Sequence, residues 1–133
     1  MRDYARLQTA ILLRRFAFQV NRTSHSGDAE SIHDLRVSIR RFSRCLRVFS
    51  QFYPNGTWRK LRSQLSELMS MAGAVRDRDI ALELLADAKI SERASAVTRL
   101  RAERERLVAE LIEELRRWKS RDFSRKWRRR LGL

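Results

Sequence analysis

Residues 32–49 read Ile-His-Asp-Leu-Arg-Val-Ser-Ile-Arg-Arg-Phe-Ser-Arg-Cys-Leu-Arg-Val-Phe, and this stretch decides the fold because it joins an apolar stripe to a row of positive charge. At about 100° per residue in a helix, the basic side chains of the row fall within an arc of roughly 80°. The row consists of His33, Arg36, Arg40, Arg44 and Arg47. A separate arc carries Ile32, Leu35, Ile39, Phe42, Leu46 and Phe49. The stretch predicts one helix that packs on a core and offers a line of cations to a ligand.

The choice of basic residue points to phosphate. The chain carries 30 Lys and Arg against 16 Asp and Glu, a net charge of +14, and 26 of the basic residues are arginine. Arginines one turn apart repel each other, and helix packing does not require them. Arginine binds phosphate through paired hydrogen bonds, whereas lysine acts as a point charge. The row therefore favours a repeating polyanion; the alternative is a solvated surface, where lysine would serve equally well.

The positive charge is local. Residues 1–62 have a net charge of +9, residues 63–115 of −3 and residues 116–133 of +8. The terminal cluster indicates a binding surface less clearly than the row does, because basic ends are often simply solvated. This cluster contains Arg125, Lys126, Arg128, Arg129 and Arg130. The nearby Trp118 and Trp127 could be core residues, contacts to a partner or stacking platforms.

The length of 133 residues predicts one domain that is large enough to bury a core. A single cysteine, Cys45, excludes an internal disulfide and fits a reducing compartment. No apolar run approaches the ~20 residues that span a bilayer. The N-terminus also lacks the apolar segment of a signal peptide. We therefore expect a cytoplasmic protein.

The low content of helix breakers, 4 Gly and 1 Pro, and the absence of strand-like alternation predict an all-α protein. Long helices with short turns favour an antiparallel bundle of five to six helices. The first helix is expected over about residues 2–22, with Tyr4, Leu7, Ile11 and Phe18 on its buried side. The second begins after a cap at Asp28 or Ser31 and continues to about Tyr53. The expected N-caps of the third and fifth helices are Thr57 and Ser91, and the fifth reaches about Lys119. A last basic helix covers about 122–131.

Residues 73–79, Gly-Ala-Val-Arg-Asp-Arg-Asp, form a second group of interest. Gly73 is expected to end the third helix, and Asp77 or Asp79 to cap a short fourth helix or to orient an arginine. Arg76 would then lie beside a helix N-terminus, where phosphate also binds well. Two carboxylates could also indicate a metal, but a hard cation needs more oxygen ligands than these provide. Arg62, early in the third helix, would add positive charge if that helix packs beside the second.

No residue pattern indicates catalysis. His33 has no second histidine, cysteine pair or carboxylate cluster at ligand spacing. We therefore assign His33 to the anion-binding row, while a catalytic histidine and a core histidine remain alternatives. We expect no catalytic residue, no metal site and no cofactor.

The same residues resemble a known family. His33-Asp34-Leu35-Arg36-Val37, followed by Arg40-Arg41 and Leu46-Arg47-Val48-Phe49, is similar to the signature of the CHAD domain, the conserved-histidine α-helical domain. Residues 73–77 with Asp79-Ile80 resemble its second motif, and Ser120-Arg121-Asp122-Phe123 resembles the end of the first half of that domain. The resemblance spans nearly the whole chain.

The resemblance implies non-catalytic binding of inorganic polyphosphate and, as in some members, localisation to polyphosphate granules. The positions that match the family's basic pattern are His33, Arg36, Arg40, Arg41, Arg44, Arg47, Arg62 and Arg76. Gly73, Asp77 and Asp79 would serve as structural or orienting residues. The usual domain has two similar helical halves around a basic cleft. This chain corresponds to one half, so it is either a fragment or a homodimer that rebuilds the cleft, and we favour the homodimer.

Two other functions stay open. The high isoelectric point, about 11.5, permits nucleic-acid binding, although the row lacks aromatic residues for base stacking. The chain could also be an accessory part of a polyphosphate- or triphosphate-processing enzyme. Such an enzyme normally holds its metals with clustered carboxylates. Here the acidic residues lie mainly in the fifth predicted helix, interleaved with arginine.

Overall fold

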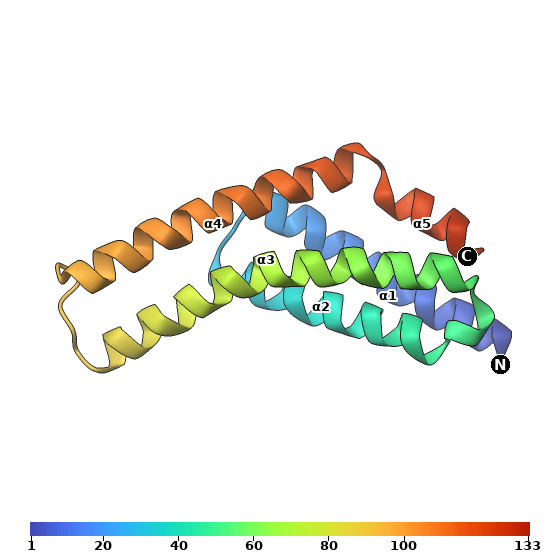
Figure 1. Ribbon diagram of the computed structural model, residues 1–133, viewed down its shortest axis with the longest axis horizontal. Coiled ribbons are helices and arrows are strands. Elements are labelled where there is room, and N and C mark those ends of the chain that lie inside the picture. Colours follow the sequence, from blue (N-terminus) through green and yellow to red (C-terminus); the bar gives the residue numbers. More distant parts are fainter.

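The computed structural model describes all 133 residues, with five α-helices and no strand (Figure 1). The helices are α1 (Arg2–His25), α2 (Ala29–Val48), α3 (Asn55–Asp87), α4 (Ser95–Ser120) and α5 (Phe123–Leu131). A short 3₁₀ turn, Ser50–Phe52, joins α2 to α3. Helices α1 to α4 run antiparallel to their neighbours in the chain, and α4 contacts both α3 and α1. The predicted all-α bundle is confirmed.

Aromatic side chains from four helices fill the end of the bundle that α5 covers. Phe16 of α1 stacks against Phe42 of α2 and Trp127 of α5, each pair with ring centroids 6.0 Å apart. Trp118 of α4 and Phe123 of α5 meet the same cluster edge to face. Because Trp118 and Trp127 are both buried, they are core residues and not stacking platforms.

The turn between α1 and α2 is capped as the sequence indicates. The Asp28 carboxylate accepts a hydrogen bond of 2.7 Å from the backbone N–H of Ser31. Gly27 lies directly before Asp28, and a Cβ at this position would overlap the Val108 side chain of α4. The close approach of turn and helix therefore requires glycine at position 27.

The predicted break at Gly73 is wrong, because α3 is one helix of 33 residues. A helix-interior glycine costs only about 1 kcal/mol relative to alanine. The buried neighbours Leu68, Ala72 and Val75 offset that cost by continuing the apolar stripe across the glycine. The separate fourth helix and its caps at Asp77 or Asp79 therefore do not exist.

Three other predicted boundaries also differ from the structure. Helix α2 ends at Val48, before the 3₁₀ turn, and not near Tyr53. Pro54 is the N-cap of α3, so the helix begins two residues before Thr57. Ala94, and not Ser91, precedes α4.

The buried side of α1 was also predicted wrongly. Its core face carries Leu13, Phe16 and Val20, whereas Tyr4, Leu7 and Phe18 are exposed. Ile11 is half-buried. Helix α1 has apolar residues on two faces, so its pattern alone could not show which of them packs inward.

The far ends of α3 and α4 project beyond α1 and α2 as a two-helix arm, here defined as residues 76–105 (Figure 1). Arg104 ties the base of the arm to the rest of the bundle. Its Nε pairs with the buried Asp79 carboxylate of α3, and its Nη2 donates a 2.8 Å hydrogen bond to the Gly27 carbonyl.

Candidate functional site

The row on α2 is available to a ligand. His33, Arg40, Arg44 and Arg47 are exposed, and Arg36 is half-buried. None of these five side chains takes part in any of the ion pairs of the structure. The repulsion between neighbouring cations is therefore not relieved within the protein.

Helix α3 converts the row into one wall of a groove. The groove between α2 and α3 has a volume of ≈ 580 Å³. Arg40, Arg44 and Arg47 line it from α2, and Arg62 lines it from α3. Its floor is apolar, formed by Ile39, Leu65 and Met69, and its polar lining is completed by Ser43, Ser66 and Ser70. The groove therefore brings four guanidinium groups and three hydroxyl groups together.

Arg62 is held toward α2 by one hydrogen bond. Its Nε donates to the Ser43 Oγ at 3.1 Å. Both terminal nitrogens of Arg62 remain available for a ligand, because neither is hydrogen-bonded within the protein. Arg62 was predicted to add positive charge to the row if the third helix packs beside the second. Helices α2 and α3 do pack together, and Arg62 lies beside the row.

The groove face of α3 continues toward Gly73 and Arg76. Residues 62, 69 and 76 are each separated by two helical turns, so they share one face of α3. Because α2 and α3 are antiparallel and Ser43 meets Arg62, positions further along α3 face earlier turns of α2. Arg76 therefore lies toward the His33 end of the row. A weak ion pair of 3.9 Å joins it to Glu83.

Gly73 lies on the same face, and a Cβ there would meet no atom within 4 Å. Its predicted role in a turn is wrong, since it lies inside α3. What the residue provides is open space on this face of α3.

Arg36 contains a buried polar atom that the protein does not satisfy. Its Nε is inaccessible to solvent and has no hydrogen-bond partner. Buried N–H groups are nearly always paired. An anion bound along the row could satisfy this group only if the Arg36 side chain moves to expose it.

Arg41 lies apart from the row. One residue beyond Arg40, it is turned about 100° around α2. It lines a different groove, between α1 and α2, together with Arg14 and Arg15. Asp34 faces that side too, where it accepts a 2.6 Å hydrogen bond from Arg22 of α1. The structure therefore separates Arg41 from the other matched cations.

The two aspartates of the second motif differ from each other. Asp77 is exposed and forms no ion pair. Asp79 is buried and binds Arg104 of α4, as described above. Asp79 therefore orients an arginine of the bundle, and neither aspartate touches a cation of the row.

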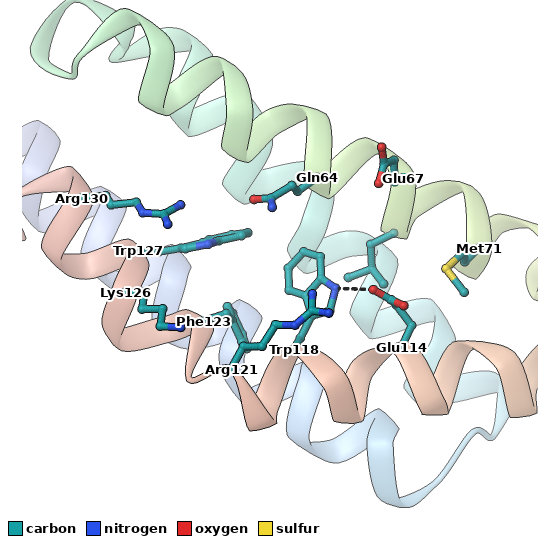
Figure 2. A pocket seen from close by; sticks show the side chains of 11 residues that line it. Gln64, Glu67, Met71, Glu114, Trp118, Arg121, Phe123, Lys126, Trp127 and Arg130 are labelled. Atoms are coloured by element: carbon teal, nitrogen blue, oxygen red, sulfur yellow. Dashed lines mark hydrogen bonds between the residues drawn. The ribbon is translucent and has the colours of Figure 1, made fainter.

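The basic C-terminus forms a second hollow on the other side of α3. Figure 2 shows Gln64 of α3 and Arg130 of α5 reaching toward the same space above Trp127. This hollow measures ≈ 370 Å³ and also contains Arg121 and Lys126. Glu114, beside it, binds Arg117 and the Trp118 indole N–H, and these hydrogen bonds lower the pKa of Glu114. The hollow mixes both charges, unlike the α2–α3 groove.

No motif in the sequence points to the hydroxyl groups of the groove. Ser43, Ser66 and Ser70 are small and polar, and such residues occur on any exposed helix face. The one available signal was the spacing of Ser66 from Arg62, one turn along the same helix. Only the packing of α2 against α3 shows that these serines face the row.

Cys45 lies on α2 near this site but is not reactive. It is buried beside Thr9 and Tyr53, whose hydroxyl groups are 2.5 Å apart. Burial raises the pKa of the Cys45 thiol. A buried thiol of raised pKa is a packing residue.

The fold and the groove define a class: a small helical bundle with an arginine-lined groove that the protein's own carboxylates do not neutralise. The chain belongs to the CHAD domain family, whose family model matches residues 9–132. No curated protein and no solved structure matches the chain. No helix has the length and apolar character needed to cross a membrane. No group of three or more His, Cys, Asp or Glu side chains is arranged to hold a metal ion.

Proposed function

We propose that the chain binds inorganic polyphosphate, without turning it over, along the α2–α3 groove. The observation that carries this proposal is the set of four arginines that line one groove and form no ion pair: Arg40, Arg44, Arg47 and Arg62. Membership of the CHAD family supports it, because this family is associated with polyphosphate-related proteins. In cells, the chain should collect where polyphosphate is stored.

The shape of the groove suits a linear chain of phosphates. The arginines of α2 recur about every helical turn, roughly 5.4 Å along the axis. Successive guanidinium groups can therefore bind oxygens along one extended polyanion. The hydroxyl groups of Ser66 and Ser70 can donate further hydrogen bonds. No aromatic residue lines the groove, so it offers no platform for stacked bases.

The test removes charge from the groove and, separately, from elsewhere. We expect Arg40→Ala with Arg44→Ala to lower polyphosphate affinity by at least about tenfold, measured by calorimetry, because two phosphate contacts are lost. The matched control is Arg14→Ala with Arg15→Ala, which removes the same charge from α1 and should change affinity by less than about threefold. Equal losses in the two double variants would show that general positive charge, and not the groove, binds the ligand.

Two further assays separate the alternative functions. Single-stranded and duplex nucleic acid, supplied at the same phosphate concentration, should fail to displace polyphosphate. Incubation of the protein with polyphosphate and magnesium or manganese should release no phosphate. Efficient displacement would favour a nucleic-acid binder, and release that depends on the groove arginines would favour an enzyme.

We also propose that two copies pair through the arm, so that two grooves form a wider cleft. Three large apolar side chains of this region are exposed: Ile80, Leu84 and Ile90. Residues 76–105 contain seven basic and seven acidic side chains, so charge does not oppose pairing there. Light scattering should give the mass of a dimer for the native chain and of a monomer for Leu84→Glu. A monomeric native chain would exclude the dimer but not the groove.

A further inference from the structure

Helix α1 has a second apolar face that is largely exposed, with Tyr4 at one end meeting Phe49 edge to face. Tyr4, Leu7 and Phe18 are 56%, 57% and 63% exposed. At about 100° per residue they fall within an arc of roughly 60°, and that arc lies opposite the face with Leu13 and Phe16. A helix with apolar residues on opposite faces is normally covered on both. Exposed apolar side chains that gather in this way mark a contact surface.

A groove lies beside this face and shares Phe18 with it. The groove between α1 and α2 has a volume of ≈ 390 Å³. Leu12 and Phe18 from α1 and Val37 from α2 form its apolar lining. Phe18 belongs to both the exposed stripe and the groove, and we call the two together the α1 surface.

The edge of the α1 surface is positively charged. Arg14, Arg15 and Arg41 line the groove, and none of them takes part in any of the ion pairs of the structure. The one carboxylate of the groove, Asp34, is bonded to Arg22. The three arginines therefore have no opposing charge within the protein. Arg41, which lies outside the α2–α3 groove, contributes positive charge to this one.

We propose that the α1 surface binds an acidic amphipathic helix of a partner protein. The apolar stripe of such a helix would cover Leu7 and Phe18, and its carboxylates would meet Arg14, Arg15 and Arg41. This is the usual way in which a groove recognises a helix, with anchors at positions i, i+3, i+4 and i+7. The match of apolar floor and cationic edge to one ligand gives both affinity and orientation.

Other occupants fit these observations less well. Polyphosphate has no apolar group to cover Phe18. A flat bilayer surface cannot enter the groove between two helices. A second copy brings the same patch to a two-fold interface, and this patch carries arginines but no free carboxylate. Charge complementarity therefore selects an acidic partner.

The test uses a fluorescent synthetic peptide of about four helical turns, with leucines at the anchor spacing and glutamates elsewhere. Its control has the same composition in shuffled order. We expect the anchored peptide to bind at least about tenfold more tightly than the shuffled one, by fluorescence anisotropy at physiological salt. Phe18→Glu should reduce its binding by about tenfold, and so should Arg14→Ala with Arg41→Ala. Leu84→Glu, at an exposed apolar site of the arm, is the matched control and should leave binding unchanged.

Three results would overturn the proposal. The first is equal binding of the two peptides. The second is conversion of a dimer into a monomer by Phe18→Glu in light scattering, which would assign the surface to a second copy. The third is loss of binding to vesicles of phosphatidylserine and phosphatidylcholine in Phe18→Glu, which would assign the surface to a membrane. Because Phe18 lies outside the α2–α3 groove, Phe18→Glu should keep native polyphosphate affinity, so this proposal and the polyphosphate proposal can fail independently.

Discussion

At the level of single residues, Ser43 controls how Arg62 meets a ligand. The hydroxyl oxygen of Ser43 accepts the Arg62 Nε–H at 3.1 Å and thereby restricts a long, flexible side chain. Binding then orders fewer rotatable bonds, since part of that ordering is already complete.

The first prediction follows from this contact. Ser43→Ala should lower polyphosphate affinity by about two- to fivefold, the range expected for one lost hydrogen bond of about 0.5–1 kcal/mol. The net charge stays the same. In an Arg62→Ala background, the Ser43 change should have no further effect. An equal loss in both backgrounds would show that Ser43 binds the ligand directly.

The second prediction concerns Gly73. Because a Cβ there has free space, Gly73→Ala should raise the free energy of unfolding by about 0.5–1 kcal/mol, measured by urea denaturation. The added methyl group also narrows the groove face of α3, so polyphosphate affinity should fall. A less stable variant would instead show that Gly73 is needed for packing.

At the level of elements, the turn between α1 and α2 depends on its contact with α4. Gly27→Ala should lower the free energy of unfolding by about 1–3 kcal/mol, because the new methyl group overlaps Val108. Val108→Ala in the same chain should restore part of the loss by making room. If the double variant were no more stable than the sum of the two single changes predicts, Val108 would not be the clashing group.

The cap of α2 predicts a pH dependence. The Ser31 N–H lowers the pKa of Asp28 below its ordinary value of 3.8. The folded-state pKa is therefore lower than the unfolded-state pKa. Asp28 thus stabilises the fold fully above about pH 3.8, and this contribution is lost as the pH falls through the folded-state value.

Asp28→Asn isolates this effect, because the amide oxygen accepts the Ser31 N–H at every pH. Below about pH 4, the free energy of unfolding should fall more steeply for the native chain than for the variant. Glu114, whose pKa is also lowered, contributes equally to both proteins and cancels in the difference. Parallel pH profiles would contradict the assigned role of Asp28.

At the level of the whole molecule, the salt dependence of polyphosphate affinity should differ between loss of the groove arginines and loss of arginines elsewhere. Each phosphate contact contributes a slope of about −0.7 to the logarithm of affinity against the logarithm of salt, the value for single-stranded polyanions. Four groove contacts would lower the affinity about 50-fold between 50 and 200 mM salt. Arg40→Ala with Arg44→Ala should reduce the slope by about 1.4, whereas Arg14→Ala with Arg15→Ala should leave it unchanged. Equal slopes in the two variants would contradict a localised site.

The sequence by itself determined the all-α class and the row on α2. Both follow from helical periodicity, which fixes the angle between side chains of one helix whatever surrounds it. The cap at Asp28 is equally local, since donor and acceptor lie three residues apart.

Only the tertiary structure decided which surfaces meet. Packing buries one of the two apolar faces of α1, and α3 continues through Gly73 as one helix. Packing also places Arg62 beside the row and Arg41 in a different groove. These outcomes depend on which neighbour buries each side chain, and that is a property of several helices at once. The sequence of one helix shows which side chains lie on each of its faces, and the packing of all the helices determines which faces are buried and which line a groove.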